Sequence, residues 1–315
     1  MKKIVALMLT VCMVLCSALA LAEEKTYQVG ICQLLQHPAL DEATRGFRDA
    51  LTEKLGDKVV FDEQNASGEA VNCATITNTF VSNGVDLIMA NATAALQAAI
   101  SATDTIPVLG TSITDYATAL GMGEFSGTTG INVSGTSDLA PLDGQAAMIQ
   151  ELFPEAKTVA LLYCSAEANS VYQINVIKGY LTDMGYECKE YSFTDSNDIA
   201  SVAQLATECD VMYIPTDNTA ASYTETIANV VLPAKVPVVV GEEGICKGCG
   251  VATLTISYYD IGYATGEMAY EILVNGADVS AMPIQYAPQF TKKYNAANVA
   301  ELGLTIPDDY VAIEE

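Results

Sequence analysis

The chain has 315 residues, of which 50% are hydrophobic and 17% are charged, and this composition excludes an intrinsically disordered protein. Its formal net charge of −25 at pH 7 would repel phosphate backbones, so we expect no nucleic-acid partner. The length allows two ordinary domains, each with a sizeable hydrophobic core.

The first residues have the pattern of a secretory signal peptide. A basic start at Lys2-Lys3 precedes an uncharged, mostly apolar run over residues 4–18, and Ala20-Leu21-Ala22 offers small residues at the two positions that a signal peptidase reads. The apolar run is too short for a membrane-spanning helix. We therefore expect residues 1–22 to be a signal peptide and the mature protein to be exported, to the periplasm or to the outer face of the cytoplasmic membrane.

In the first half of the remaining chain, short apolar runs alternate with segments of helical period. The segment from Leu40 to Leu55 places its apolar residues on one face of a helix, and Gly56 follows it as a stop signal. The expected strands cover residues 27–33, 59–61, 85–90, 106–109 and 130–133. This alternation predicts a parallel sheet with helices on both faces.

The same order of elements starts again at a strand over residues 159–163. The segment Asp86 to Thr93 is echoed by Asp210 to Thr219, and Ile106 to Gly110 is echoed by Val236 to Gly241. The spacing, about 130 residues, is that of a whole domain. The sequence therefore predicts an α/β fold of two Rossmann-like lobes with parallel sheets, joined by a hinge of several strands.

The last part of the chain is predicted to complete the two lobes and not to form a third domain. We expect a strand at 251–256, a helix at 259–274, an extended piece at 282–287 and a helix at 296–302. On this basis the N-terminal lobe covers residues 23–137 and 257–283. The C-terminal lobe covers residues 138–256 and 284–315.

Polar, loop-forming residues follow the strands of both halves. Ligands of open parallel sheets bind beyond the carboxyl ends of the strands, so we expect these loops to face each other across a cleft. Thr93 opens a helix directly after a strand, and its hydroxyl and the first free N–H groups can hold a carboxylate. Asp217 and Glu242 can hold a cationic amine. The alternative interpretation is that Thr93 and Asp217 only cap helices.

A catalytic function has little support in the sequence. His37 is the only histidine, so no His-based triad, His cluster or zinc site of common composition can form. Cys246 and Cys249 form a Cys-x-x-Cys motif without a second pair at zinc spacing. We expect a local disulfide there, with redox chemistry as the alternative. No catalytic residue, metal or cofactor is expected.

The segment Gly30-Ile31-Cys32-Gln33, followed by His37-Pro38-Ala39-Leu40-Asp41, resembles the opening of the tryptophan/tyrosine-type ABC transporter substrate-binding proteins. Pro215-Thr216-Asp217-Asn218 is similar to a second motif of that family, and the similarity covers almost all of the mature chain. The resemblance implies a type I periplasmic-binding-protein fold and an amino-acid ligand, often aromatic. It also implies that Gln33, His37, Thr93 and Asp217 lie in the cleft.

We therefore predict a monomeric, extracytoplasmic solute-binding protein that binds a small amino acid-like ligand, with an aromatic amino acid favoured, in the cleft between the lobes. It would deliver this ligand to the permease and ATPase of an ABC importer. Two alternatives stay open: a ligand sensor that acts with a membrane receptor, and an exported thiol oxidoreductase that uses the Cys-x-x-Cys motif. The residues expected to bind the ligand are Gln33, His37, Asn91, Ala92, Thr93, Ser112, Asp115, Asn169, Ser170, Thr216, Asp217, Asn218, Glu242 and Tyr258.

Overall fold

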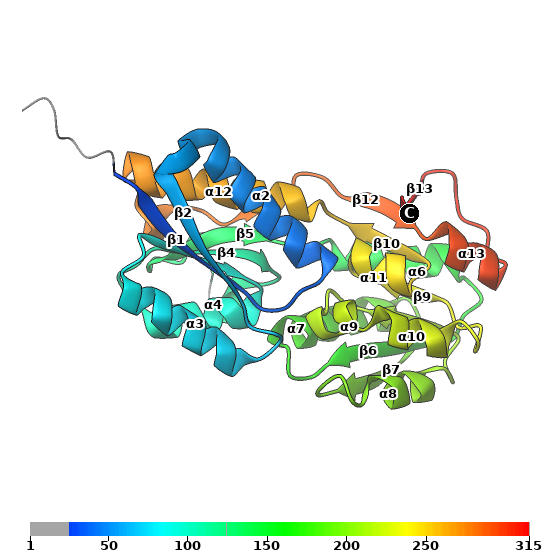
Figure 1. Cartoon of the computed structure of the whole chain (residues 1–315). Coiled ribbons are helices and arrows are strands. Elements are labelled where there is room, and N and C mark those ends of the chain that lie inside the picture. Colours follow the sequence, from blue (N-terminus) through cyan, green and yellow to red (C-terminus); the bar gives the residue numbers. More distant parts are fainter. Residues whose placement is uncertain (1–24, 124, 315) are drawn as a thin grey trace, which may run out of the picture.

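The computed structural model describes residues 25–123 and 125–314 (Figure 1). The signal peptide expected at residues 1–22 lies outside the described residues. Within these ranges no helix is both long enough and apolar enough to cross a membrane. Two sheets, each with helices on both faces, form the two lobes of an α/β fold, which confirms the fold class predicted from the alternation of strands and helices.

The first lobe is built on a six-stranded parallel sheet in the order β11-β5-β4-β3-β1-β2. Its strands are β1 (Tyr27–Gln33), β2 (Val59–Asn65), β3 (Leu87–Asn91), β4 (Val108–Ile113), β5 (Val133–Ser137) and β11 (Gln285–Tyr286). Its helices are α2 (Pro38–Leu55), η1 (Gly56–Lys58), α3 (Ala70–Asn83), α4 (Thr93–Ala102), α5 (Tyr116–Leu120), α12 (Tyr258–Asn275) and η2 (Val279–Ala281). Helices α2 and α12 lie on one face of the sheet, and α3 and α4 lie on the other (Figure 1).

The central strands of this lobe are buried on both faces. Ile31 and Met89 pack toward α2 and α12, whereas Cys32 and Ala90, their neighbours in sequence, pack toward α3 and α4. Successive side chains of a strand point to opposite faces. A strand covered on both sides therefore reads as a continuous apolar run, which is the pattern that the sequence shows.

The second lobe is built on a seven-stranded sheet in the order β13-β12-β10-β9-β8-β6-β7, in which β12 runs antiparallel to β10. Its strands are β6 (Thr158–Cys164), β7 (Glu187–Phe193), β8 (Val211–Ile214), β9 (Val238–Val240), β10 (Ala252–Thr255), β12 (Thr291–Tyr294) and β13 (Val311–Ala312). Its helices are α6 (Leu142–Leu152), α7 (Ala168–Asp183), α8 (Ile199–Ala206), α9 (Asn218–Ser222), α10 (Thr224–Val231), α11 (Glu243–Gly248) and α13 (Ala296–Leu302).

Three segments cross between the lobes. The chain passes from β5 to α6, returns from β10 to α12, and crosses again from β11 to β12. The third crossing lies later than expected, because Gln285 and Tyr286 of β11 pair with Thr136 and Ser137 of β5. The boundary expected between residues 283 and 284 therefore moves past Tyr286.

Two glycines let α2 and α12 touch backbone to backbone. A Cβ atom on Gly46 would lie 2.1 Å from the carbonyl oxygen of Tyr259, and one on Gly262 would lie 2.0 Å from the carbonyl oxygen of Ala43. Any larger side chain would push the helices apart. This contact holds the start of α2 beside the first turn of α12, where the second crossing enters the first lobe.

Candidate functional site

The carboxyl ends of the parallel strands in the two sheets face a common cleft, and side chains meet across it. The Nε2 atom of His37, just before α2, lies 3.3 Å from Oδ1 of Asn218 at the start of α9. The hydroxyl of Ser222 donates to the carbonyl oxygen of Gln36 at 3.4 Å. Helix α5 also packs against α7, and α2 against α11. The lobes are therefore in contact, and the cleft between them is closed.

The turn from β3 into α4 leaves several N–H groups available. Ala92 precedes the helix with a φ of +87°, a backbone conformation that is uncommon for a residue with a side chain. The N–H groups in the first turn of a helix have no intrahelical partner, and in α4 this turn begins at Thr93. No side chain of the described residues caps these N–H groups. These N–H groups and the positive end of the helix dipole suit a carboxylate or another anion.

Ser112 lies beside this turn and is also strained. It has a φ of +56° at an irregularity in β4. The preceding residue, Thr111, pairs with Asn91, and its carbonyl oxygen accepts a hydrogen bond from the N–H of Ala92. The hydroxyl of Ser112 is buried without a partner among the described residues. Residues with strained backbone of this kind are common at ligand-binding sites. Two of them, Ala92 and Ser112, lie at the start of α4.

Asn91 stabilises the same turn through hydrogen bonds to α2. It is fully buried, and its side-chain nitrogen donates to the carbonyl oxygen of Leu40 at 2.8 Å and to the hydroxyl of Thr44 at 3.0 Å. Its Oδ1 atom has no partner among the described residues. Asn91 therefore fixes the end of β3 against α2 and keeps one unpaired acceptor.

Gln33 is engaged within the first lobe. Its Nε2 atom donates to the carbonyl oxygen of Leu35 and to Asp41, and its Oε1 atom accepts from the hydroxyl of Thr44 at 2.6 Å. It lines a polar hollow of about 630 Å³ whose walls all come from the first lobe, among them Arg45 and Arg48. The structure therefore places Gln33 in the network that anchors α2.

Three carboxylates predicted to lie in the site cap helices. Asp115 accepts from the N–H of Thr118 at 2.7 Å and is half-buried. Asp217 accepts from the N–H groups of Ala220 and Cys164, at 2.8 and 2.7 Å. Burial, reinforced by the nearby charge of Glu167, raises the pKa of Asp217 to about 7.

Glu242 is the third of these carboxylates. It accepts from the N–H groups of Gly244 and Ile245 at the start of α11. Burial raises its pKa to about 7. All three carboxylates therefore cap helices in the structure. A carboxylate that accepts two hydrogen bonds retains two further lone-pair sites, and Asp217, which also accepts from the hydroxyl of Ser170, retains one.

Glu167 is a central residue of a loop expected at a strand end, although it was not among the residues expected to bind the ligand. Its Oε2 atom accepts from the backbone N–H and the side-chain nitrogen of Asn218, at 3.0 and 2.7 Å, and from Asn169 at 3.1 Å. Its Oε1 atom accepts from the N–H and hydroxyl of Thr219. Asn169 also donates to Ser170 and to the carbonyl oxygen of Thr216. Glu167 is thereby part of one hydrogen-bond network that contains four of the residues expected to bind the ligand: Asn169, Ser170, Thr216 and Asn218.

A buried carboxylate joins two of the crossings. The hydroxyl of Tyr258, where α12 begins, donates to Asp138 at 2.9 Å, and the hydroxyl of Thr114 donates to the other oxygen at 3.0 Å. Asp138 follows β5 in the first crossing, and burial raises its pKa. Asp138 lies in a short connection between β5 and α6, where hydrophobic periodicity does not identify functional residues.

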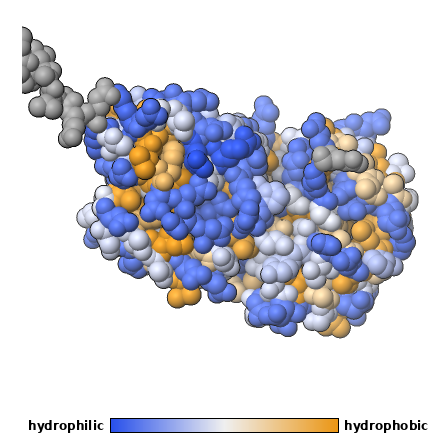
Figure 2. Space-filling view, in the orientation of Figure 1, coloured by the Kyte–Doolittle hydropathy of each residue, from blue (hydrophilic) through white to orange (hydrophobic). Residues whose placement is uncertain are grey.

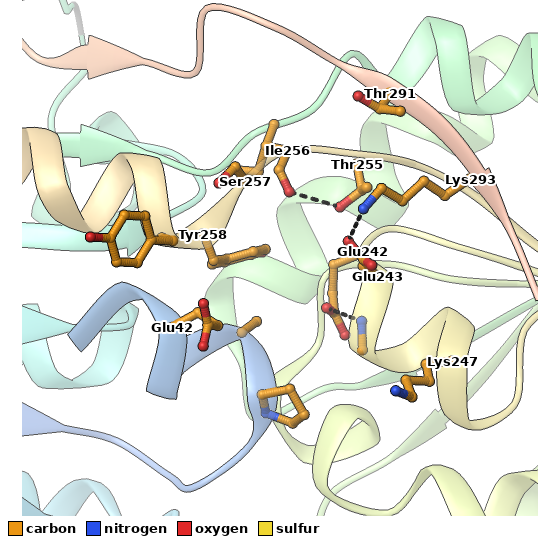
Figure 3. A pocket seen from close by; sticks show the side chains of 14 residues that line it. Glu42, Glu242, Glu243, Lys247, Thr255, Ile256, Ser257, Tyr258, Thr291 and Lys293 are labelled. Carbon is orange, nitrogen blue, oxygen red and sulfur yellow. Dashed lines mark hydrogen bonds and ion pairs between the residues drawn. The ribbon is translucent and has the colours of Figure 1, made fainter. Parts of the chain in front are cut away.

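A cavity of about 380 Å³ lies between the lobes, and Figure 3 shows the side chains that line it. Its walls come from the start of α2, from α11, from the crossing into α12 and from β12. Glu242 and Tyr258 line it, together with an ion pair between Glu243 and Lys293 at 2.6 Å. Pro38 and other apolar groups at the start of α2 and in the crossing make the cavity amphipathic.

Cys246 and Cys249 are buried free thiols, so the local disulfide expected from their spacing is not formed in the structure. Burial raises the pKa of both thiols, which keeps them protonated and unreactive. The redox alternative loses its support. Among the described residues, no group of three or more His, Cys, Asp or Glu side chains is arranged to hold a metal ion.

Comparisons with known proteins agree on one family. The family model described as "ABC transporter substrate binding protein" matches residues 28–314. A tyrosine-binding protein of Clostridioides difficile (strain R20291) is 35% identical over 265 residues, which cover 83% of this chain and 76% of the relative.

Two solved structures add detail. A Streptococcus pneumonia ABC domain in complex with L-Trp is 32% identical, with a TM-score of 0.86 over 90% of this chain and 97% of the other. A substrate binding protein with adhesive properties from Clostridium difficile, solved open and ligand-free, is 34% identical, with a TM-score of 0.70 over 92% and 99%. The lower score for the open relative fits the interlobe contacts described above.

Proposed function

The chain belongs to the ABC transporter substrate binding protein family, and from this premise we propose that it captures an aromatic amino acid between its lobes. Two relatives support this choice of ligand, since one is named a tyrosine-binding protein and another was solved with L-Trp. Within the described part of this chain, the observation that supports it best is the start of α4, which no side chain caps, beside the hydroxyl of Ser112, which has no partner.

We assign the ligand carboxylate to the first lobe. The N–H groups of the first turn of α4, the hydroxyl of Thr93 and the hydroxyl of Ser112 would donate to it. Helix N-termini favour anions because their free N–H groups and the helix dipole act together. The strained φ angles of Ala92 and Ser112 are consistent with a turn held in place for binding.

We assign the ligand ammonium group to the second lobe. Asp217 and Glu242 are its expected partners, through the lone-pair sites that the capping N–H groups leave free. Glu167 adds to the negative potential at the same place. A bound cation would favour the charged forms of Asp217 and Glu242, whose pKa values of about 7 make them sensitive to such a neighbour.

The ligand side chain would lie toward the cavity in Figure 3, where Pro38, Ala39 and Ile256 form an apolar wall and Tyr258 offers a ring. In this account, the closed cleft delivers its ligand to the permease and ATPase of an importer. We place the mature protein outside the cytoplasmic membrane as a monomer.

A thermal-shift screen of the protein, stripped of ligand by unfolding and refolding, tests this function. An aromatic amino acid at 100 times its dissociation constant should stabilise the fold by about 2.7 kcal/mol. That corresponds to a rise in Tm of roughly 5–10 °C for lobes of this size. A rise with tyrosine, tryptophan or phenylalanine supports the proposal. A rise with another metabolite, and with no aromatic amino acid, would overturn the choice of ligand.

A further inference from the structure

The contact between His37 and Asn218 is a buried polar link between the lobes. His37 precedes α2 in the first lobe, and Asn218 begins α9 in the second. Their side chains meet at 3.3 Å, and the two residues are only 6% and 8% exposed. Separating the lobes would return both side chains to water. The chemistry of this link therefore influences the balance between open and closed forms.

Glu167 determines which way the Asn218 amide faces. The side-chain nitrogen of Asn218 lies 2.7 Å from Oε2 of Glu167, and a carboxylate only accepts hydrogen bonds. The amide nitrogen must therefore face Glu167, and the amide oxygen faces His37. This assignment follows from the chemistry of the partners, since hydrogen positions are inferred from the network.

The same reasoning fixes the tautomer of His37. Oδ1 of Asn218 can only accept, so Nε2 of His37 must bear a proton. The other ring nitrogen, Nδ1, is buried and has no partner among the described residues. A second proton on Nδ1 would create a buried charge and a buried N–H without an acceptor, both of which are costly.

We propose that Glu167 is a positioning residue that acts through Asn218 to hold His37 as the neutral Nε2–H tautomer, and that the lobes close only on this neutral ring. The inference rests on the proposed function, because it describes how closure over the ligand is regulated. It adds to that function a dependence of ligand affinity on pH.

The sign of this dependence follows from burial. Burial lowers the pKa of His37 in the closed form, while the bond to Asn218 and the charges of Glu167 and Asp41 act in the opposite direction with smaller effect. In the open form the ring would titrate near its usual value of ~6.5. Closure is therefore favoured above ~6.5 and weakens as the pH falls from there toward the lowered pKa. The dissociation constant should rise by up to about tenfold per pH unit in that window.

Two carboxylates near the cleft also titrate in this pH range. The pKa values of Asp217 and Glu242 are raised to about 7. Since we assign the ligand ammonium group to these two carboxylates, their protonation as the pH falls through about 7 would weaken binding in the same direction as protonation of the ring. A variant at His37 separates their contribution from that of the ring.

The test begins with NMR of the ¹⁵N-labelled protein, saturated with L-tyrosine at pH 7.5. The sequence contains one histidine, so its ring resonances are unambiguous. We expect the Nε2–H tautomer, and dissociation constants measured from pH 7.5 to 5.5 should rise as stated. His37→Gln should lose the part of this rise that comes from the ring, so its dissociation constant should rise less than that of the wild type over the same range. An Nδ1–H tautomer, or the same pH profile in His37→Gln and wild type, would overturn the proposal.

Glu167→Gln tests the positioning role. Its amide can donate as well as accept, so Asn218 is free to turn, and we expect a mixture of His37 tautomers and a roughly tenfold loss of affinity at pH 7.5. Glu190→Gln, an exposed carboxylate of the same lobe that pairs with Lys178, is the matched control and should match the wild type. If Glu167→Gln weakens binding without changing the tautomer, Glu167 is only a cap for α9 and the proposal fails. Binding of no amino acid by the wild type would instead overturn the proposed function, and this inference with it.

Discussion

Thr93→Asp is expected to abolish amino-acid binding without destabilising the ligand-free protein. The new carboxylate would stand at the first position of α4, where no side chain of residues 25–123 and 125–314 caps the N–H groups. It would occupy the place that we assign to the ligand carboxylate and repel any ligand that enters. The same charge is favourable for the helix, because an acidic side chain in the first turn complements the helix dipole by about 0.3–1 kcal/mol.

The measurement combines calorimetric titration with L-tyrosine and thermal unfolding without ligand. We expect the dissociation constant to rise more than about 100-fold, equivalent to ~2.7 kcal/mol, while the Tm stays level or rises. Ala70→Asp is the matched control, since Ala70 begins the neighbouring helix α3 and is exposed. It should leave binding unchanged. Affinity within threefold of wild type in Thr93→Asp would show that the carboxylate binds elsewhere.

Gly262→Ala is expected to cause a large loss of stability. Its Cβ atom would lie 2.0 Å from the carbonyl oxygen of Ala43 and 2.7 Å from the Cα atom of the same residue. Backbone atoms cannot move aside as a flexible side chain can, so α2 and α12 must separate. Overpacking of this kind costs about 3 kcal/mol. The Tm should fall by roughly 6–12 °C.

Gly179→Ala is the control for this substitution. Gly179 lies in α7, is exposed, and has nothing within 4 Å of the position of a Cβ atom. Alanine should stabilise the protein there by about 0.5–1 kcal/mol, because it loses less conformational freedom in a helix. Equal stability of Gly262→Ala and wild type would contradict the close approach of the two helices. Since α2 begins beside His37 and α12 begins at Tyr258, we also expect weaker ligand binding in Gly262→Ala.

The sequence predicted the two lobes because their pattern is local. Strands buried on both faces read as apolar runs, and each is followed by a segment of helical period. The position of Thr93 could be predicted for the same reason, since a polar residue directly after the apolar run of β3 begins the next helix. The start of α4 and the turn at Asn91 could therefore be predicted from the local sequence alone.

Contacts between residues far apart in the sequence could not be predicted from local patterns. Gln33 ends the first strand as expected, but its amide turns to Asp41 and Thr44, and that direction depends on how α2 packs. Glu167 accepts its bonds from Asn218 and Thr219, which become its neighbours only because β8 lies beside β6 in the sheet. Periodicity does not identify such partners.

The cysteine motif shows the same limit. Its spacing predicts a disulfide in an exported protein, and the structure instead buries both thiols in the core of the second lobe with Val240 and Ile245. Their apolar surroundings depend on how α11 packs against the sheet, which spacing alone does not reveal.

The most direct test of the central claim is calorimetric titration of the ligand-stripped wild-type protein with L-tyrosine and with tyramine, which has the same ring and amine but no carboxylate. If the start of α4 holds the carboxylate, L-tyrosine should bind and tyramine should bind at least about 100-fold more weakly, a difference of ~2.7 kcal/mol. Equal affinity for the two compounds, or no binding of L-tyrosine, L-tryptophan or L-phenylalanine, would contradict the account.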